Sequence, residues 1–142
     1  MPGFKELFEG SQLLTGSGSA IDASKLDGLD VVGVYFSAHW CPPCRGFTPQ
    51  LAKVYKALKA QGKKFEIVFV SSDRDEAGFT GYFAEQPWLA VPFSARNVKK
   101  NLCDTFGIRG IPTLLLFDGK GNLVRSDGRS AVQNPAAFPW KP

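Results

Sequence analysis

The sequence predicts an α/β protein in which a mixed central sheet is flanked by helices. Two runs of apolar, β-branched and aromatic residues, 31–36 and 65–70, enclose a stretch with helical spacing. Such a strand–helix–strand unit implies parallel strands joined by a right-handed crossover. A third run, 113–117, is followed by a turn and a short antiparallel partner at 123–125. The chain has 142 residues, 44% hydrophobic and 21% charged, which suits one compact domain spanning 1–142.

Little regular structure is expected before the first of these strands. A short helix is predicted within residues 1–8, where apolar residues recur at helical spacing. These residues are Phe4, Leu7 and Phe8. Residues 10–18 are rich in glycine and serine and predict turns with one weak strand. The run 31–36 has no alternation of polar and apolar residues, so we expect a strand that is buried on both faces.

A long amphipathic helix is predicted from Pro42 to about Gln61. Its apolar face consists of residues at helical spacing: Phe47, Leu51, Val54, Tyr55 and Leu58. Proline is tolerated in the first helical turn because the N–H groups there have no intrahelical partner. Pro49 lies deeper and should kink the helix, and Gly62 should end it.

Two shorter helices are expected between the second and third strands. Asp73, with Glu76 three positions later, has the spacing of a helix N-cap. The apolar face of that helix is formed by Phe79, Tyr82 and Phe83, and Pro87 should end it. The second helix is predicted by Val98, Leu102 and Phe106, with Gly107 at its end. The tail, 134–142, contains three prolines and has little room for a long closing helix.

Charge and cysteine content exclude several classes of protein. The net charge is +4, and the densest basic set has helical spacing: Lys53, Lys56, Lys59, Lys63 and Lys64. We interpret this set as a solvated helix face, so we expect no nucleic-acid partner. No apolar run approaches the roughly 20 residues that span a bilayer, so no membrane partner is expected. Residues 1–10 lack the order of a secretory signal, and three cysteines are too few for a disulfide scaffold. We therefore expect a cytoplasmic protein, with the nucleus left open.

The strongest chemical signal is Cys41-Pro42-Pro43-Cys44, at the junction between a strand and a helix. Two cysteines three positions apart can close a disulfide at a helix start. The helix N-terminus favours a thiolate at the first position, so Cys41 is predicted to be the nucleophile, open to solvent. Cys44, one turn further in, should be more buried and should attack the mixed disulfide formed at Cys41.

The two prolines between the cysteines bear on the reduction potential. Neither Pro42 nor Pro43 has an N–H group that could donate to the Cys41 sulfur. We therefore expect moderate stabilisation of the thiolate and a protein that favours reduction over strong oxidation.

A metal site is the main structural alternative for these cysteines. A closed zinc site needs four ligands, and Cys103 and His39 have no paired spacing, so we expect no metal. Haem attachment is excluded because Arg45, and not histidine, follows Cys44.

The segment from Tyr35 to Arg45 closely resembles the active-site segment of the nucleoredoxin and tryparedoxin branch of the thioredoxin superfamily. The resemblance continues through Val70-Ser71-Ser72-Asp73-Arg74, Tyr82-Phe83, Pro87-Trp88-Leu89-Ala90-Val91-Pro92, Gly110-Ile111-Pro112-Thr113 and Phe138-Pro139-Trp140. It covers most of the chain from about residue 25 onward. The sequence around the cysteines is more similar to that of nucleoredoxin, and the single-domain size of the chain is more similar to that of tryparedoxin.

The resemblance implies a thioredoxin fold, a redox-active disulfide between Cys41 and Cys44, and reduction of protein disulfides. Pro112 would be the cis-proline that faces the dithiol, and the backbone of Ile111 would pair with a substrate strand. Thioredoxin has a buried aspartate where this chain has Tyr35. The base that deprotonates Cys44 therefore stays open between Asp73 acting through a water, the Tyr35 hydroxyl and solvent.

Several other residues have a functional and a structural interpretation. We expect Trp40 to shield the dithiol and shape the partner surface rather than pack at the core edge. Asp73 is either a proton shuttle or an N-cap. Arg45 and Arg109 could steer acidic substrates, but for Arg109 plain surface charge is preferred. For the remaining three residues we expect structural roles. His39 should lie at the rim of the site, Cys103 should be a packing residue, and Trp88 should be part of the core beneath the site.

These observations predict a protein-disulfide reductase of thioredoxin fold. We expect no bound cofactor, with electrons supplied by another dithiol or a reductase, and a monomer that acts on disulfide-containing client proteins. The competing hypothesis is a redox-responsive binding module whose dithiol switches its affinity for a partner. A peroxidase of the same fold is disfavoured because the chain lacks a peroxidatic Pro-x-x-x-Thr-x-x-Cys segment.

Overall fold

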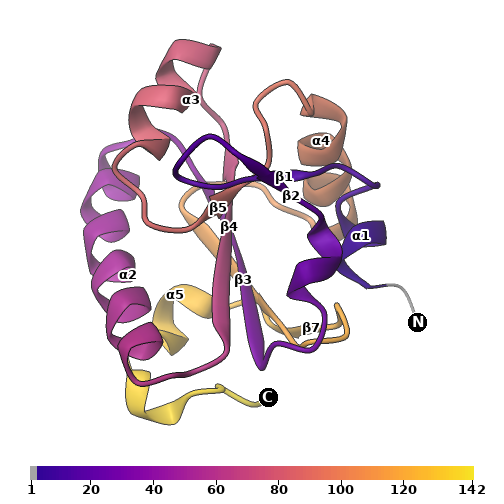
Figure 1. Cartoon of the computed structure of the whole chain (residues 1–142). Coiled ribbons are helices and arrows are strands. Elements are labelled where there is room, and N and C mark those ends of the chain that lie inside the picture. Colours follow the sequence, from indigo (N-terminus) through magenta and orange to yellow (C-terminus); the bar gives the residue numbers. More distant parts are fainter. Residues whose placement is uncertain (1–2) are drawn as a thin grey trace.

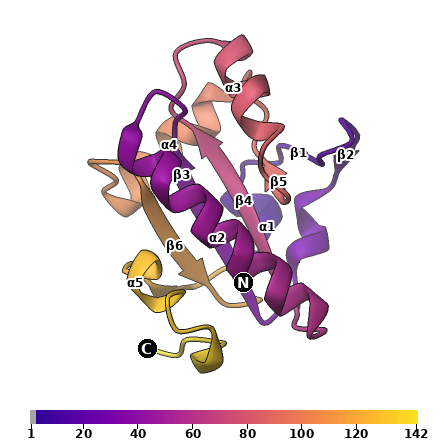
Figure 2. The same cartoon turned by 90° about the vertical axis from the view of Figure 1, so that its left-hand side faces the viewer.

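A computed structural model describes residues 3–142 and contains one seven-stranded mixed sheet. The strand order is β2-β1-β5-β4-β3-β6-β7. Helices cover both faces of this sheet (Figures 1 and 2). On one face lie α2 (Pro42–Ala60), α3 (Glu76–Phe83) and α5 (Gly128–Ala131). On the other lie α1 (Phe4–Leu7), the 3₁₀ helix η1 (Ala23–Leu26) and α4 (Arg96–Phe106).

The three strands predicted from apolar runs form the centre of the sheet. They are β3 (Val31–Ser37), β4 (Phe65–Ser71) and β6 (Thr113–Phe117). β3 and β4 are parallel from Val31 opposite Phe65 to Ser37 opposite Ser71, with α2 between them in the chain. β6 runs antiparallel to β3, and β7 (Leu123–Arg125) pairs antiparallel with β6. The predicted parallel unit and hairpin are therefore confirmed.

Three short strands extend the sheet, and two of them, β2 and β5, were not predicted. β1 (Leu13–Leu14) lies in the stretch where one weak strand was expected, and β2 (Ala20–Ile21) pairs with it as a hairpin. β5 (Leu89–Ala90) lies parallel to β4. Each strand has two residues, which is too short to show the alternation by which a strand is recognised in a sequence.

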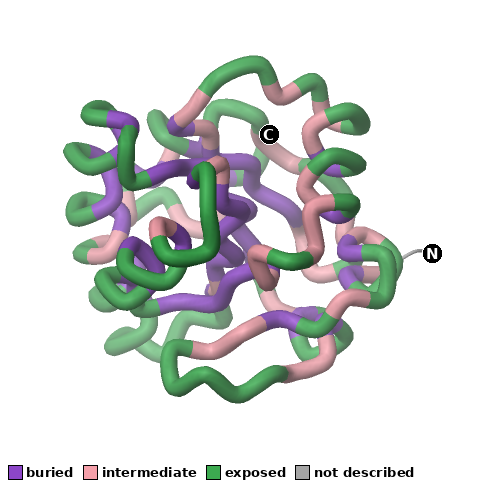
Figure 3. The backbone as a smooth tube through the Cα atoms, turned by 90° about the horizontal axis from the view of Figure 1, so that it is seen from above, coloured by how far each residue is buried: buried purple, intermediate pink, exposed green. Residues whose placement is uncertain are grey.

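Two apolar cores lie on opposite faces of the sheet. We call them the α2 face and the α4 face after the longest helix of each. Every residue of β3 is buried, as predicted, because successive side chains alternate between the two cores. Seen from above, the central strands are buried inside a shell of exposed helices and loops (Figure 3). The buried α2 face is rich in aromatic residues, among them Tyr35, Phe47, Tyr55, Phe69, Tyr82 and Trp88. The buried α4 face is mostly aliphatic, with Val32, Val34, Val68, Val70, Leu102 and Leu115.

Helix α2 follows the predicted pattern. The helix continues through Pro49 and ends before Gly62, whose φ of +77° suits glycine. The five lysines expected on a solvated face are all exposed. This confirms that the basic set is solvent-exposed along the helix and the turn that follows it.

The expectation that Asp73 caps α3 is wrong. Asp75 is the N-cap, and its Oδ1 accepts from the Gly78 N–H at 2.8 Å. The chain needs two more residues than predicted to turn away from β4 before the helix can begin at Glu76. α3 ends at Phe83, several residues before Pro87, whereas α4 ends at Gly107 in the left-handed conformation, as predicted.

The ends of the chain agree with the expected short helices. α1 covers Phe4–Leu7, within the predicted range 1–8. Phe4 and Phe8 are buried on the α4 face. Residues 1 and 2 of the predicted range lie outside the described residues. The tail forms only the 3₁₀ helix η2 (Pro135–Ala137). Within residues 3–142, no helix has both the length and the apolar character needed to cross a bilayer.

Candidate active site at the N-terminus of α2

The dithiol lies where β3 ends and α2 begins. Cys41 is the N-cap residue of α2, and Pro42 and Pro43 occupy the first helical positions. The Cys44 backbone N–H donates to the Cys41 sulfur at 3.4 Å. Because the prolines supply no N–H, this bond carries the capping role at the helix end, where partial positive charge favours a negative sulfur. Both cysteines are free thiols in this structure.

Cys41 is more enclosed than the sequence predicted. Its exposed fraction is 5%, and that of Cys44 is 0%. The two cysteines form a small cluster with Ala38, against which the half-buried Ile111 packs. The order of exposure is as expected, but the approach to the Cys41 sulfur is narrow because the loop containing Ile111 closes over it.

The charge state of Cys44 is set by its surroundings. Its pKa is raised to about 11, first by burial and then by hydrogen bonding with Cys41. The Ser37 hydroxyl and the Ala38 backbone act in the opposite direction and favour the thiolate. Cys44 is therefore a neutral thiol near pH 7 and must lose its proton before it can act as a nucleophile.

The loop before β6 faces the first cysteine. The Ile111–Pro112 peptide bond is cis, as the resemblance implied, and a second cis bond, Phe138–Pro139, was not expected. The Ile111 carbonyl oxygen lies 3.9 Å from the Cys41 sulfur. The Pro112 carbonyl accepts from the Arg129 guanidinium at 3.3 Å, which ties this loop to α5.

Trp40 lies at the surface beside the dithiol. Its exposed fraction is 47%, so packing at the core edge is excluded. The indole Nε1–H donates to the Ser72 carbonyl at 3.0 Å, and the Arg74 guanidinium lies 5.0 Å from the ring centroid. These contacts hold a large aromatic surface in a fixed position. Arg45 is also exposed.

Asp73 holds the loop that carries the dithiol. It lies just after the carboxyl end of β4, as predicted, and it is buried. One oxygen accepts from the His39 backbone N–H at 2.8 Å, and the other accepts from the Ser71 hydroxyl at 2.7 Å. Both oxygens are thus engaged with the backbone and side chain of neighbouring segments, which fits a positioning role.

The hydrogen-bond partners of the Tyr35 hydroxyl are Thr48 and the backbone of Cys44. It bonds to Thr48 Oγ1 at 2.6 Å and lies 3.5 Å from the Cys44 carbonyl oxygen. Burial raises the Tyr35 pKa far above its ordinary value. Its ring packs edge-on against Trp88 in the core beneath the site, where Trp88 was expected. An ionised Tyr35 is therefore not a base for Cys44 near pH 7.

The other candidates lie apart from the dithiol chemistry. His39 is exposed, with its ring 5.5 Å from that of Tyr82, and Arg109 is exposed. Cys103 is half-buried against the α4 face, as expected of a packing residue, and burial raises its pKa. No cluster of potential metal ligands occurs within residues 3–142.

Sequence reasoning missed a group of hydroxyls next to Cys44, contributed by Ser37, Thr48 and Tyr82. Ser37 ends β3, Thr48 lies one turn after Cys44, and Tyr82 comes from α3. Tyr82 was assigned only to an apolar helix face. The four-residue spacing from Cys44 to Thr48 was a usable signal, because side chains at that spacing are neighbours on a helix.

Comparison with known proteins defines the class to which this fold and site belong. A family model described as thioredoxin-like matches residues 28–123. The chain therefore belongs to the thioredoxin-like family.

The relatives are nucleoredoxins and tryparedoxins. Nucleoredoxin from Danio rerio is 48% identical, over 98% of this chain and 34% of the relative. The chain thus spans about a third of the length of the nucleoredoxins that it matches. Tryparedoxin from Trypanosoma brucei brucei is 39% identical over 99% of both chains. The native structure of tryparedoxin I from Crithidia fasciculata is 42% identical, with a TM-score of 0.89 and 99% coverage of each chain. A structure of tryparedoxin II complexed with glutathionylspermidine has a TM-score of 0.89 at 39% identity, covering 99% of this chain and 100% of that one.

Proposed function

We propose that this protein reduces disulfide bonds of client proteins by dithiol–disulfide exchange. The observation that supports it most directly is the pairing of the two cysteines. Cys41 accepts a hydrogen bond at the helix N-terminus, and a neutral Cys44 thiol lies directly behind it. The Cys41 sulfur attacks a client disulfide, forms a mixed disulfide and releases one client thiolate.

The second step completes the exchange. The Cys44 sulfur attacks the Cys41 sulfur, the bond to the client breaks, and the client leaves as a second thiolate. The client disulfide gains two electrons, and Cys41 and Cys44 become a disulfide. An external dithiol or a reductase then returns the two electrons. The complex of the related tryparedoxin II with glutathionylspermidine supports a low-molecular-weight thiol compound as one class of donor.

The surface around Cys41 supports docking of an extended client segment. Trp40 gives a fixed aromatic surface on one side, and the loop of Ile111 and Pro112 lies over the sulfur on the other. The exposed prolines Pro42 and Pro43 and the exposed Arg45 lie next to them on α2. A client strand that pairs with the Ile111 backbone would bring its disulfide to the narrow opening above Cys41.

The test is to trap the mixed disulfide. Cys44→Ser should leave clients covalently bound to Cys41, and mass spectrometry should identify them. Cys41→Ser is the matched control and should capture none. Insulin reduction with a dithiol donor then separates catalysis from redox-dependent binding, since only a reductase turns over. Absence of adducts that depend on Cys41, or capture without turnover, would refute the proposal.

The reduction potential is expected to be that of a reductant. Because both prolines lack an N–H, the Cys44 N–H is the donor from the first helical turn that reaches the Cys41 sulfur. We expect a potential close to the roughly −270 mV of thioredoxin and far from the roughly −120 mV of a strong oxidant. Equilibration with a glutathione redox buffer measures it.

A further inference from the structure

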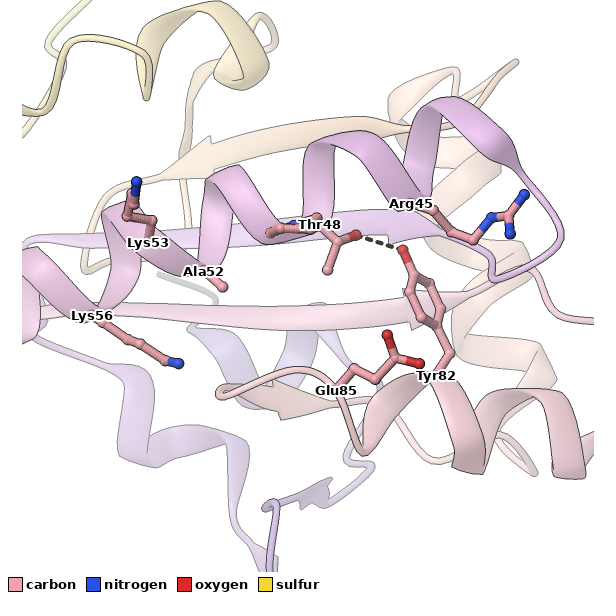
Figure 4. A pocket seen from close by; sticks show the side chains of 8 residues that line it. Arg45, Thr48, Ala52, Lys53, Lys56, Tyr82 and Glu85 are labelled. Carbon is pink, nitrogen blue, oxygen red and sulfur yellow. Dashed lines mark hydrogen bonds between the residues drawn. The ribbon is translucent and has the colours of Figure 1, made fainter.

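A cleft of about 520 Å³ lies between α2 and α3, next to the dithiol (Figure 4). We call it the α2–α3 cleft. Two of the residues that line it, Thr48 and Tyr82, are buried, and their hydroxyls are hydrogen-bonded to each other. The Thr48 hydroxyl also lies 2.9 Å from the Cys44 carbonyl oxygen. Because these hydroxyls already have partners inside the protein, recognition of a ligand in the cleft falls to its charged side chains.

The charged residues that line the α2–α3 cleft are mostly basic. α2 contributes Arg45, Lys53 and Lys56, and the chain just after α3 contributes Glu85. Figure 4 shows Arg45 at one end of the cleft, the two lysines at the other end and Glu85 on the opposite side. All four residues are exposed. Three cations therefore face one carboxylate on a surface that is open to solvent.

Within residues 3–142, none of the three cations of the cleft takes part in an ion pair. Lys59, on the next turn of α2, differs in this respect because its Nζ lies 3.5 Å from a carboxylate oxygen of Glu66. Like charges that lie three or four residues apart on a helix repel each other, as Lys53 and Lys56 do. An anionic ligand would relieve this repulsion, so charge complementarity favours an acidic partner.

A second cleft of similar size provides an internal comparison. It has a volume of about 510 Å³ and lies between α2 and the residues that follow α5, Val132 and Gln133. Among the described residues that line it, Lys53 is the charged one, and the others are apolar or carry amides. Lys53 lines both clefts, whereas Arg45 and Lys56 line only the α2–α3 cleft. An acidic ligand is therefore attracted more strongly to the α2–α3 cleft than to its neighbour.

The α2–α3 cleft begins beside the dithiol. Arg45 directly follows Cys44 in α2. On the other side, His39 stands two residues before Cys41, and its exposed ring lies 5.5 Å from the ring of Tyr82, which lines the cleft. A client bound at Cys41 can therefore extend past His39 into the cleft without leaving the surface of the protein.

We propose that the α2–α3 cleft binds an acidic segment of the client protein that lies close in sequence to the disulfide being reduced. This inference rests on the proposed reductase function and names the class of client that the site selects. Binding in the cleft promotes the encounter and the first step of the exchange, formation of the mixed disulfide. The second step takes place between sulfur atoms that are already joined to the client or adjacent to it, so it needs no contribution from the cleft.

The length of the cleft predicts where the acidic residues of the client should lie. A helix rises about 1.5 Å per residue, which places Arg45 roughly 6 Å and Lys56 roughly 22 Å along α2 from Cys41. An extended chain covers about 3.3 Å per residue, so client residues from about two to about seven positions away from the reacting cysteine lie opposite these cations. Acidic residues much further along the client should have little effect.

Two disulfide peptides of equal length test the inference, one with glutamates over this range on both sides of the disulfide and the other with glutamines. In Cys44→Ser the mixed disulfide accumulates, and acid quench with mass spectrometry gives its second-order rate constant of formation. Each rate constant is divided by that for dithiothreitol, which reports the intrinsic reactivity of the disulfide. We expect the acidic peptide to react about tenfold faster at low ionic strength, as several exposed ion pairs would produce. The ratio should approach one in concentrated sodium chloride.

Charge variants then locate the effect. Lys53→Glu combined with Lys56→Glu should bring the ratio of acidic to neutral peptide to about one or below, whereas Glu85→Gln should raise it. The matched control is Lys64→Glu combined with Lys120→Glu. It changes the net charge by the same amount at exposed positions before β4 and between β6 and β7, at the edge of the sheet opposite the dithiol. This control should keep most of the preference, because screening weakens charges that lie far from the cleft.

The outcomes separate the cleft from the reductase function. Equal losses of preference in the two double variants would show attraction by net charge alone and would overturn the inference. A DNA oligonucleotide that competes with the acidic peptide more strongly than a cysteine-free copy of that peptide does would assign the cleft to another partner and overturn it as well. If both peptides form the mixed disulfide at equal normalised rates, the cleft inference fails and the reductase stands. If neither peptide forms a mixed disulfide at Cys41, the proposed function itself fails.

Discussion

The α2 face and the α4 face cover the same sheet but bury different kinds of atoms. On the α2 face, buried tyrosine, threonine and serine hydroxyls pair with one another near the dithiol, and Tyr55 pairs with Glu66 further along α2. The α4 face contains aliphatic side chains and phenylalanine in its buried core. Burying a polar group costs free energy unless the group is hydrogen-bonded. The hydroxyls near Cys44 meet this condition because they are hydrogen-bonded to one another. The paired hydroxyl groups therefore lie on the α2 face, whereas the α4 face contributes Ile111, which packs against the dithiol.

The largest expected effect distinguishes the dithiol from Cys103, the cysteine on the α4 face. Cys41→Ser should reduce the rate of insulin reduction by roughly a thousandfold or more, because it removes the nucleophile of the first step. Cys103→Ser, on the α4 face, should leave the rate unchanged. A large loss in Cys103→Ser would show that the chemistry extends to both faces.

The next effect is on stability alone. Leu102 is buried on the α4 face, so Leu102→Ala should lower the free energy of unfolding by about 3 kcal/mol, measured in urea. Under conditions where the variant is fully folded, the rate of mixed-disulfide formation should equal that of the wild type. A reduced rate in the folded variant would mean that the α4 face tunes the dithiol and does not merely support it.

A third effect is the dependence of stability on pH. The Cys44 pKa is about 11 in the folded chain against an ordinary value of 9.0, mainly because of burial. As pH rises, the unfolded chain therefore loses the Cys44 proton at a lower pH than the folded chain does. The contribution of the Cys44 thiol to the free energy of unfolding is complete below about pH 9 and lost by about pH 11. Its size is on the order of 2 kcal/mol. Urea unfolding of the reduced protein from pH 8 to 11 measures it, with Cys44→Ala as the control that should lose less stability over this range. Parallel pH profiles for the two proteins would contradict it.

The smallest effect tests the cap of α3. Asp75→Ala should cost about 1 kcal/mol of stability, because the Gly78 N–H loses its partner. Asp73→Ala should instead affect the dithiol loop, since Asp73 accepts from the His39 N–H, and should change the rate of mixed-disulfide formation. Urea unfolding and single-turnover kinetics together separate the two aspartates. Identical consequences for both would show that neither has the separate role assigned to it.

Much of the fold was predictable because its central elements are long enough to show their period. β3, β4 and β6 each present an uninterrupted apolar run, and α2 has 19 residues with apolar and charged faces. The two-residue strands offered no such pattern. The capping error at Asp73 arose because the residues from Asp73 to Glu76 satisfy the spacing of a capping box, and only the path of the chain after β4 shows that Asp75 is the cap.

The dithiol was predictable from local spacing, whereas its surroundings were not. Cys41 and Cys44 lie three residues apart, and their relation is set by one turn of helix. The hydroxyl network joins Ser37 to Tyr82 across 45 residues, and it exists only because α3 packs over the end of β3. A tyrosine on an apolar helix face gives no sign in the sequence of where its hydroxyl points. The enclosure of Cys41 by Ile111 is likewise a property of packing between distant segments.

The shortness of the outermost strands has a consequence for the protein in concentrated solution. The sheet ends in β2 with two residues on one side and β7 with three on the other. Each end therefore offers little unpaired backbone on which another molecule could build a continuous β-structure. The long apolar strands that would otherwise promote aggregation lie in the middle of the sheet, so the sheet has little exposed edge on which copies of the protein could stack.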